Sequence, residues 1–231
     1  MSFPRRPLVD VPAVTTDQMR EVDRLMIEGA GISLLQMMEN AGRSLAAVVL
    51  ARYPEASITI LAGKGGNGGG GLVAARHLAN RGASVTVVMG ADDLSPVAAH
   101  QFSIVKAMGV PLVPEPVAAD VVVDALVGYS LRGAPRGRTA ELIGWANESP
   151  GQVVALDMPS GVDSTTGETP GAAVSAGATM TIALPKTGLV ASDLAGHLYL
   201  TDISVPQSVY ATLGVEVPAD LFTQGQVLRL T

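Results

Sequence analysis

The sequence of 231 residues predicts one α/β domain in which a mostly parallel sheet is covered by helices. Short apolar segments alternate with segments of helical periodicity along most of the chain. Hydrophobic residues make up 48% of the sequence but aromatic residues only 3%, so the core must be aliphatic, as in buried parallel strands. A glycine-rich run between an apolar segment and a helical one completes the pattern, because it is typical of a strand-turn-helix unit.

The first elements are predicted to be two helices. Residues 1–14 are proline-rich, and we expect a poorly ordered N-terminal extension to a single domain over residues 15–231. Thr15-x-x-Gln18 and Ser33-x-x-Gln36 are capping boxes, and Gly29–Gly31 ends the first helix. Their predicted buried stripes are Met19, Val22 and Met26 in the first helix, and Leu34, Met38, Ala41, Leu45 and Val48 in the second. Glu39 and Arg43 have the spacing of an exposed ion pair.

The remaining elements alternate. We predict strands at 57–61, 84–89, 110–113, 121–127, 152–156, 179–184 and 197–201, with helices after residue 72, near 96–108 and near 139–147. The late strands can run antiparallel at an edge, and Gly167–Gly177 is expected to be a loop. If the sheet reverses direction at its first strand, the segment 121–127 lies beside that strand, and ligands bind outside their carboxyl ends.

Residues 61–72 contain seven glycines, which favours a turn where a ligand approaches the backbone closely. The free N–H groups at the following helix N-terminus suit a phosphate, so a nucleotide-like ligand is expected. Gly63-x-Gly65-x-x-Gly68 matches the dinucleotide fingerprint in letters, but no acidic residue ends the next strand. Lys64 precedes the glycines, which excludes a Walker A loop. Hydride transfer and ATP hydrolysis are therefore not indicated.

Asp124 lies within an apolar strand, where an unpaired carboxylate is costly, so it should have a partner. That partner is either a backbone cap or cationic side chain, or a metal ion that Asn67 and Ser160 also bind. Oxygen ligands suit hard cations, and a single carboxylate favours a monovalent one.

Asp157, at a strand end, is a candidate acid/base or ligand-hydroxyl acceptor, or else a turn-capping residue. Ser160 lacks a nucleophile elbow and an evident histidine base, so a serine hydrolase is not expected. Lys186 and Arg132 can neutralise phosphates or be solvated loop cations, and Lys186 reaches the same sheet edge if its strand is parallel.

Composition limits the classes of protein that fit. The net charge of −6 argues against a nucleic-acid partner. Without cysteine, disulfides and thiolate chemistry are excluded. No apolar run approaches the roughly 18 residues of a membrane span, and the first residues do not read as a secretory signal, so a soluble cytoplasmic protein is expected.

Five segments taken together resemble the NAD(P)H-hydrate epimerase family, also called the YjeF N-terminal domain. They are Met37–Gly42, the glycine turn with Asn67, Asp124–Gly128, Asp157–Gly161 and Pro185–Leu189, and the resemblance runs from about Val14 to Pro206. It implies a Rossmann-like three-layer α/β/α sandwich, a homodimer, and an isomerase that interconverts the R and S epimers of NADHX and NADPHX. A companion NAD(P)H-hydrate dehydratase is the implied functional partner.

The resemblance also assigns roles. It implies a potassium ion bound by Asn67, Asp124 and Ser160, and makes Asp157 the candidate acid/base. The implied substrate-binding residues are Gly66, Asn67, Gly68, Gly69, Gly70, Gly128, Tyr129, Ser130, Leu131, Arg132, Gly133, Ala134 and Asp157. Gly66 and Gly70 replace an Asn and an Asp of the family turn, and Arg132 replaces a Lys. A non-catalytic nucleotide-binding or protein-interaction module of the same fold, like the scaffold domain of an enhancer of mRNA decapping, is the alternative.

Overall fold

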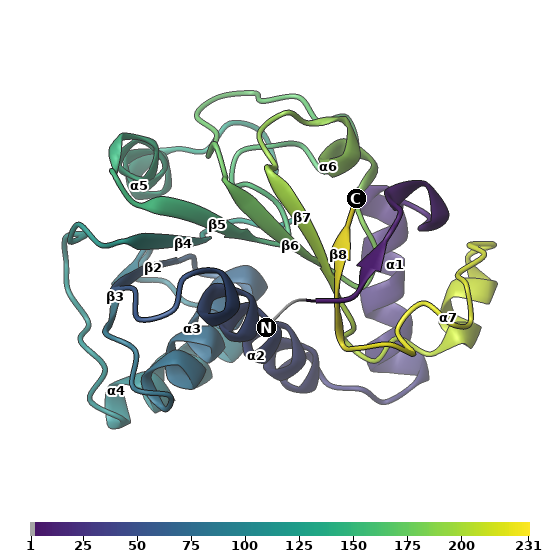
Figure 1. Ribbon diagram of the computed structural model, residues 1–231, viewed down its shortest axis with the longest axis horizontal. Coiled ribbons are helices and arrows are strands. Elements are labelled where there is room, and N and C mark those ends of the chain that lie inside the picture. Colours follow the sequence, from purple (N-terminus) through teal and green to yellow (C-terminus); the bar gives the residue numbers. More distant parts are fainter. Residues whose placement is uncertain (1–2) are drawn as a thin grey trace.

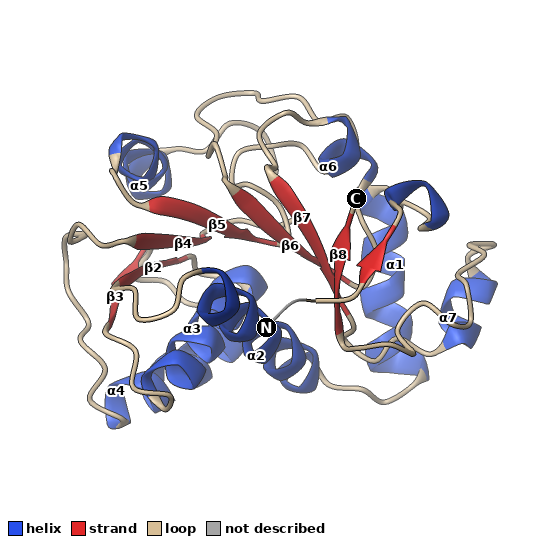
Figure 2. Ribbon diagram, in the orientation of Figure 1, coloured by secondary structure: helices blue, strands red, loops and turns tan. Residues whose placement is uncertain are grey.

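The computed structural model describes residues 3–231, which form an eight-stranded sheet with helices on both of its faces (Figures 1 and 2). The strands are β1 (Arg5–Arg6), β2 (Ile58–Ala62), β3 (Val85–Met89), β4 (Val121–Ala125), β5 (Gln152–Leu156), β6 (Ala178–Ile182), β7 (His197–Thr201) and β8 (Val227–Leu230). Their order is β1-β8-β7-β6-β5-β4-β2-β3, and all neighbours are parallel except β7 and β8. The mostly parallel α/β/α sandwich is thus confirmed.

The helices are α1 (Thr16–Arg24), α2 (Leu34–Arg52), α3 (Gly66–Ala79), α4 (Pro96–Ala107), α5 (Gly137–Glu148), α6 (Thr187–Ala191) and α7 (Gln207–Thr212). A π-turn at Leu25–Gly29 prolongs α1, and a 3₁₀ turn covers Leu8–Asp10. Both predicted capping boxes are present, at Thr15 and at Ser33. Within residues 3–231, no helix combines the length and the apolar character that a membrane crossing requires.

Alternating side chains of the central strands separate two cores. Ile60, Val123 and Val154 pack with α2 and α3, whereas Val122 and Ala155 pack with α5 on the opposite face. A further apolar cluster joins α1 to β7, β8 and the start of α2. The central strands are buried on both sides, which explains why they appear in the sequence as continuous apolar runs.

Several expectations about the elements were wrong. Residues 3–14 are part of the folded domain rather than a poorly ordered extension, since Arg5–Arg6 pairs with Arg229 and Leu230 of β8 at the sheet edge. Residues 110–113 contribute one parallel bridge, between Leu112 and Val87, rather than a strand. The strands predicted at 121–127 and 179–184 end two residues earlier, and Ala183 has a positive φ of 63° that turns the chain out of the sheet.

Glu39 does not pair with Arg43. Its carboxylate instead contacts Arg76 and accepts a hydrogen bond from His77 Nε2 at 2.7 Å, so it links α2 to α3. Arg43 donates to the side-chain oxygen of Gln226 at 3.0 Å. Both partners of Glu39 lie on α3, which packs against α2. An ion pair at i, i+4 spacing is weak, so these partners from another helix replace it.

The topology places four strand ends on one edge. β2 lies between β3 and β4, so the sheet reverses direction at β2 as predicted. β4, β5 and β6 follow in parallel, and their carboxyl ends all reach the edge where the glycine turn leaves β2. This is the edge at which open α/β sheets bind ligands.

Candidate functional site

The glycine turn packs so tightly that part of its composition has a structural cause. A Cβ at Gly68 would lie 1.7 Å from the carbonyl oxygen of Gly63, and one at Gly63 would lie 1.8 Å from that of Leu126. At Gly71 a Cβ would meet Ala125 at 2.5 Å, so α3 can lie against the sheet only without side chains there. Gly65, the residue before the helix, has nothing within 4 Å and no side-chain cap. The first N–H groups of α3 are therefore the part of the turn open to a ligand.

Asp157 is the carboxylate of the site that forms an ion pair. It follows β5 in the left-handed conformation (φ 69°) and is 1% exposed. Its Oδ1 contacts the Nζ of Lys186 in an ion pair, and its Oδ2 accepts a hydrogen bond from the backbone N–H of Tyr129 at 2.9 Å. Thr181 donates a longer bond to Oδ1, at 3.4 Å. Asp157 is thus a partner of a buried cation as well as a residue at a turn.

Lys186 is fully buried, which overturns the expectation of a solvated loop cation. It follows β6, which is parallel to β5, and so reaches the shared edge. Besides Asp157, its ammonium donates to the carbonyl oxygen of Ile182 at 2.9 Å, and it lies 5.8 Å from the centroid of the Tyr129 ring. These partners replace water around the charge, as a buried ammonium requires.

Asp124 and Ser160 meet directly. The Ser160 hydroxyl donates to Asp124 Oδ1 at 2.6 Å, and its backbone N–H donates to Oδ2 at 2.8 Å. The N–H of Leu126 also donates to Oδ1, at 3.2 Å. Burial raises the pKa of Asp124 to about 6, although these hydrogen bonds oppose the shift. The predicted backbone cap is therefore present, and no cationic side chain in residues 3–231 forms an ion pair with this carboxylate.

The oxygen atoms around Asp124 suit a hard monovalent cation. Besides Asp124 and Ser160, the carbonyl oxygen of Val127 lies 3.1 Å from the Ser160 hydroxyl. The side chain of Asn67 lies beside Gly128, which follows Val127. A Cβ added to Gly128 would be 3.0 Å from Asn67 Oδ1. Its buried Nδ2 has no hydrogen-bond partner in the described part of the chain, and no hydrogen bond joins it to Asp124 or Ser160 there. A carboxylate, a hydroxyl, a backbone carbonyl and the amide oxygen of Asn67 are the kinds of ligand atom that such an ion prefers.

A cavity of about 240 Å³ opens where these elements meet. Of the predicted residues, those lining it are Gly66, Asn67, Gly70, Gly128, Tyr129, Ser130 and Asp157. An adjoining hollow shares four of them and adds Leu131, Arg132 and Ala134, together with the cations Lys64 and Arg136. Gly68, Gly69 and Gly133 line neither space, and Gly68 and Gly69 are buried.

The cavity also has walls that sequence reasoning missed. They are the acidic residue Asp23 of α1 and the apolar side chains of Leu34, Met37, Met38, Ala41, Leu156, Ile182 and Ile203. The sequence holds a signal for Asp23, since this residue lies four residues after Met19 and next to Val22 of the predicted buried stripe. An acidic residue bordering such a stripe is a signal for a polar partner or a ligand.

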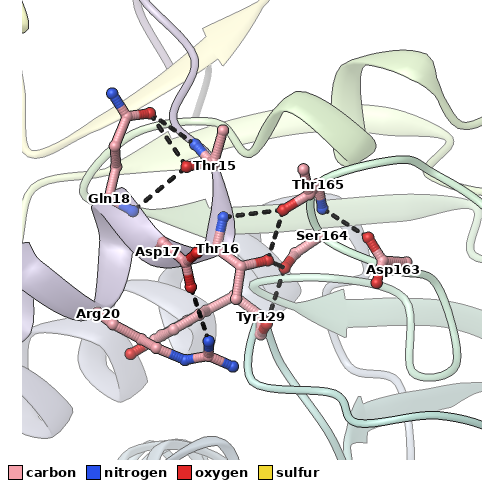
Figure 3. Close-up of polar contacts among 9 residues, drawn as sticks. All are labelled: Thr15, Thr16, Asp17, Gln18, Arg20, Tyr129, Asp163, Ser164 and Thr165. Carbon is pink, nitrogen blue, oxygen red and sulfur yellow. Dashed lines mark hydrogen bonds and ion pairs between the residues drawn. The ribbon is translucent and has the colours of Figure 1, made fainter.

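Hydroxyl groups attach α1 to this site (Figure 3). The Thr16 hydroxyl contacts that of Ser164 and lies 2.8 Å from that of Thr165. Ser164, in turn, donates to the carbonyl oxygen of Tyr129 at 2.7 Å. The first turn of α1, the loop after β5 and the loop after β4 are thereby joined.

Residues 34–188 match the model of a family described as YjeF-related protein N-terminus. The chain belongs to this family. The matched segment contains every residue described above at the sheet edge except those of α1 and Ile203.

Curated relatives of this YjeF-related chain carry two kinds of name. An NAD(P)H-hydrate epimerase of Dehalogenimonas lykanthroporepellens is 46% identical over 96% of this chain and 94% of its own length. One of Rhodopirellula baltica is 36% identical over 89% and 90%. A bifunctional NAD(P)H-hydrate repair enzyme of Hyperthermus butylicus is 45% identical over 81% of this chain but only 37% of its own length.

The fold of this YjeF-related chain recurs in a solved structure. The crystal structure of yeast ynu0 superposes with a TM-score of 0.80, covering 95% of this chain and 100% of the yeast chain, at 23% identity. At that identity the likeness shows the fold alone.

Proposed function

We propose that this chain is an NAD(P)H-hydrate epimerase, an isomerase that interconverts the R and S forms of NADHX and NADPHX. The similarity to the epimerase of Dehalogenimonas lykanthroporepellens, at 46% identity over nearly the whole of both chains, carries this proposal. The site supports it independently, because a cavity with a buried ion pair adjoins a hollow bordered by Lys64, Arg132 and Arg136. The mixed polar and apolar walls of the cavity suit a hydrated nicotinamide ring, and the cationic side chains of the hollow suit a diphosphate.

The chemistry requires that a hydroxyl leaves a ring carbon and water returns to either face. That carbon also bears the ring nitrogen, whose lone pair expels the hydroxyl once the hydroxyl is protonated, leaving an iminium. Asp157 lies at the cavity wall and is the acid/base residue in this proposal. Its partners Lys186 and the N–H of Tyr129 fix the orientation of the carboxylate.

A potassium ion is part of the proposal. Asn67, Asp124 and Ser160 would hold it, and when bound it supplies positive charge near the phosphates of the substrate. Anomalous scattering from crystals in which thallium replaces potassium should give a peak between Asn67 and Asp124. A map without a peak there would remove the ion from the proposal.

The enzymatic proposal is tested by incubating the purified chain with R-NADHX and following the ratio of epimers by chromatography. The ratio should approach equilibrium faster than in buffer, and Asp157→Ala should abolish the acceleration. A ratio that moves no faster than in buffer would favour the non-catalytic module, for which the replacements Gly66 and Gly70 would then be the first residues to examine.

The remaining proposals concern assembly and location. We propose a cytoplasmic homodimer that works with an NAD(P)H-hydrate dehydratase, since bifunctional relatives carry repair activity on a longer chain. Light scattering of the purified chain measures the mass of the assembly, and a monomer at micromolar concentration would contradict the dimer.

A further inference from the structure

Asp23 lines the cavity from a helix outside the glycine turn and the two strand-end loops. The hydroxyl of Tyr129 donates a hydrogen bond to its Oδ2, and both side chains are cavity walls. No sequence motif singles out this pair, because Asp23 and Tyr129 are 106 residues apart. The contact places a carboxyl and a phenol side by side at the space proposed for the ring of the substrate.

Contacts of α1 fix both the backbone and the hydroxyl of Tyr129 next to Asp23. Thr16 lies seven residues before Asp23, so the two share one face of α1. The contact of Thr16 with Ser164, and the bond from Ser164 to the Tyr129 carbonyl, secure the backbone of Tyr129 against the start of the helix (Figure 3). Tyr129 is thus attached to α1 through its carbonyl at one end and through its hydroxyl at the other. Such double attachment keeps the phenol in one orientation.

The electrostatics of the pair favour a proton reservoir. Burial raises the pKa of Asp23 above its ordinary value, although the bond from Tyr129 and the charge of Lys186 oppose this, and the charge of Asp157 adds to it. Burial and the adjacent Asp23 raise the pKa of Tyr129 as well, with Arg20 acting in the other direction. Both groups therefore hold a proton more firmly than they do in water, and the phenol is protonated at neutral pH.

Asp157 differs in its partners. It is in contact with a buried ammonium and accepts from the N–H of Tyr129, so its oxygens already face donors. A carboxylate in an ion pair is better suited to accept a proton than to give one. Epimerisation needs both, because one proton goes to the leaving hydroxyl and another comes from the water that adds to the other face.

We propose that Tyr129 is a second catalytic residue of the site, donating the proton to the leaving hydroxyl, and that Asp23 is the positioning residue that supplies that proton. This inference rests on the proposed epimerase function. Together the two residues form an acid that complements Asp157 as the base.

The step balances as follows. The phenol proton moves to the substrate hydroxyl, the C–O bond breaks with its electron pair leaving as water, and the nitrogen lone pair forms the C=N bond of the iminium. The Asp23 carboxyl then donates its own proton to the phenolate oxygen, which reverses the direction of the hydrogen bond between the two side chains, and becomes a carboxylate. A water molecule then bonds to the carbon on the opposite face, the C=N pair returns to nitrogen, and Asp157 takes the excess proton. Exchange with solvent water then removes the proton from Asp157 and returns one to Asp23, so that no net proton is gained or lost.

The test compares Asp23→Asn and Tyr129→Phe with the wild-type chain in the NADHX assay, as profiles of kcat and KM against pH. Each variant should lower kcat by about 100-fold, the usual scale for losing a positioned proton donor, while KM changes less than about threefold. In the wild-type chain kcat should fall as pH rises through the titration of Asp23, since its proton is then lost. That fall should be missing from Asp23→Asn, whereas a merely structural role would leave the shape of the profile unchanged.

Two further variants make the test specific. Glu21→Gln removes a carboxylate from the same helix, one that pairs with Arg24 outside the cavity, and should retain the wild-type rate and profile. The double variant Asp23→Asn, Tyr129→Phe should be no slower than the slower single variant, because the two residues act as one unit.

The outcomes separate this inference from the proposed function. A wild-type chain that does not accelerate epimerisation overturns the function, and the inference with it. An active wild-type chain overturns the inference alone if Asp23→Asn keeps the wild-type pH profile, if only KM rises, or if the effects of the two substitutions multiply. Thermal unfolding of each variant shows whether it is folded. If Asp23→Asn does not fold, the same criteria are applied to Tyr129→Phe, and its result decides whether the inference holds.

Discussion

Two buried carboxylates on neighbouring strands differ in how their charge is compensated. Asp157, after β5, has an ammonium in contact with it, whereas Asp124, in β4, has only a hydroxyl and backbone N–H groups. Their exposures are almost the same, at 1% and 0%. Burial alone therefore does not decide the role of a carboxylate. The ion pair is complete within the protein, and the Asp124 region is left with a charge that an added cation can neutralise.

The largest effect is expected at the complete ion pair. Lys186→Met leaves the Asp157 charge buried without a counter-charge and should lower the free energy of unfolding by about 3–5 kcal/mol. Adding Asp157→Asn removes the charge and should restore most of this stability without restoring epimerase activity. Urea unfolding of the three chains measures the difference. If the double variant is as unstable as Lys186→Met, the loss comes from packing rather than from charge.

The second effect is a dependence of stability on pH at Asp124. Because burial raises its pKa from 3.8 to about 6, the folded chain binds this proton more tightly than the unfolded chain. The contribution of Asp124 to the free energy of unfolding is therefore greatest below the unfolded pKa and falls as pH rises through the folded one. The total decrease is at most about 3 kcal/mol.

This decrease also tests the cation. Urea unfolding at about pH 4 and about pH 7 should show a smaller decrease in potassium chloride than in tetramethylammonium chloride, because a bound ion favours the carboxylate. Asp124→Asn should remove both the decrease and the effect of the salt. Equal pH dependence in the variant and the wild-type chain would assign the decrease to other groups.

A smaller effect is expected at the residue between the two regions. A Cβ on Gly128 would lie 2.8 Å from Asp157 Oδ2 and 3.0 Å from Asn67 Oδ1. Gly128→Ala should displace both side chains and slow epimerisation about tenfold or more, since such shifts of catalytic groups are costly. Gly144→Ala in α5, with nothing within 4 Å, is the matched control and should retain activity and gain stability. Equal rates for the two variants would show that the neighbours of Gly128 adjust freely.

The smallest effect compares the hydroxyl partners. Ser160→Ala removes a 2.6 Å bond to Asp124 and should cost about 1–2 kcal/mol, because a buried carboxylate oxygen loses a donor. Thr181→Val removes only a 3.4 Å bond to Asp157, which keeps Lys186 and Tyr129, and should cost less. Thermal unfolding ranks the two. A larger loss of stability for Thr181→Val than for Ser160→Ala would contradict this expectation. It would mean that Asp157 depends on its hydroxyl donor even though it has a cationic partner.

The sequence predicted the features that local chemistry determines. Capping boxes located the starts of α1 and α2, and the glycine-rich run located the junction of β2 with α3, although α3 begins at Gly66 inside that run rather than after residue 72. Parallel strands have their carboxyl ends on one edge, so the presence of Asp157 and Lys186 at the same edge followed from a topological argument, although their ion pair was not predicted. Each of these inferences needs only a short segment or a general rule of chain crossover.

Features that depend on distant partners were not predicted. Glu39 contacts a helix 37 residues further along, and β1 pairs with a strand at the other end of the chain. Asp23 reaches the cavity because apolar packing and hydroxyl contacts hold α1 against segments far away in the sequence. The ligand set around Asp124 remains a prediction for Asn67, whose amide the structure places next to Gly128 rather than against the carboxylate.

The left-handed backbone of Asp157 limits which side chains can occupy that position. Aspartate, asparagine and glycine adopt a φ of 69° with least strain, whereas β-branched and bulky residues do not. Of those three, only aspartate carries a negative charge opposite Lys186. An evolving chain that kept this turn would therefore have almost no substitute for its acid there, and a change of chemistry at this edge would first require a different backbone.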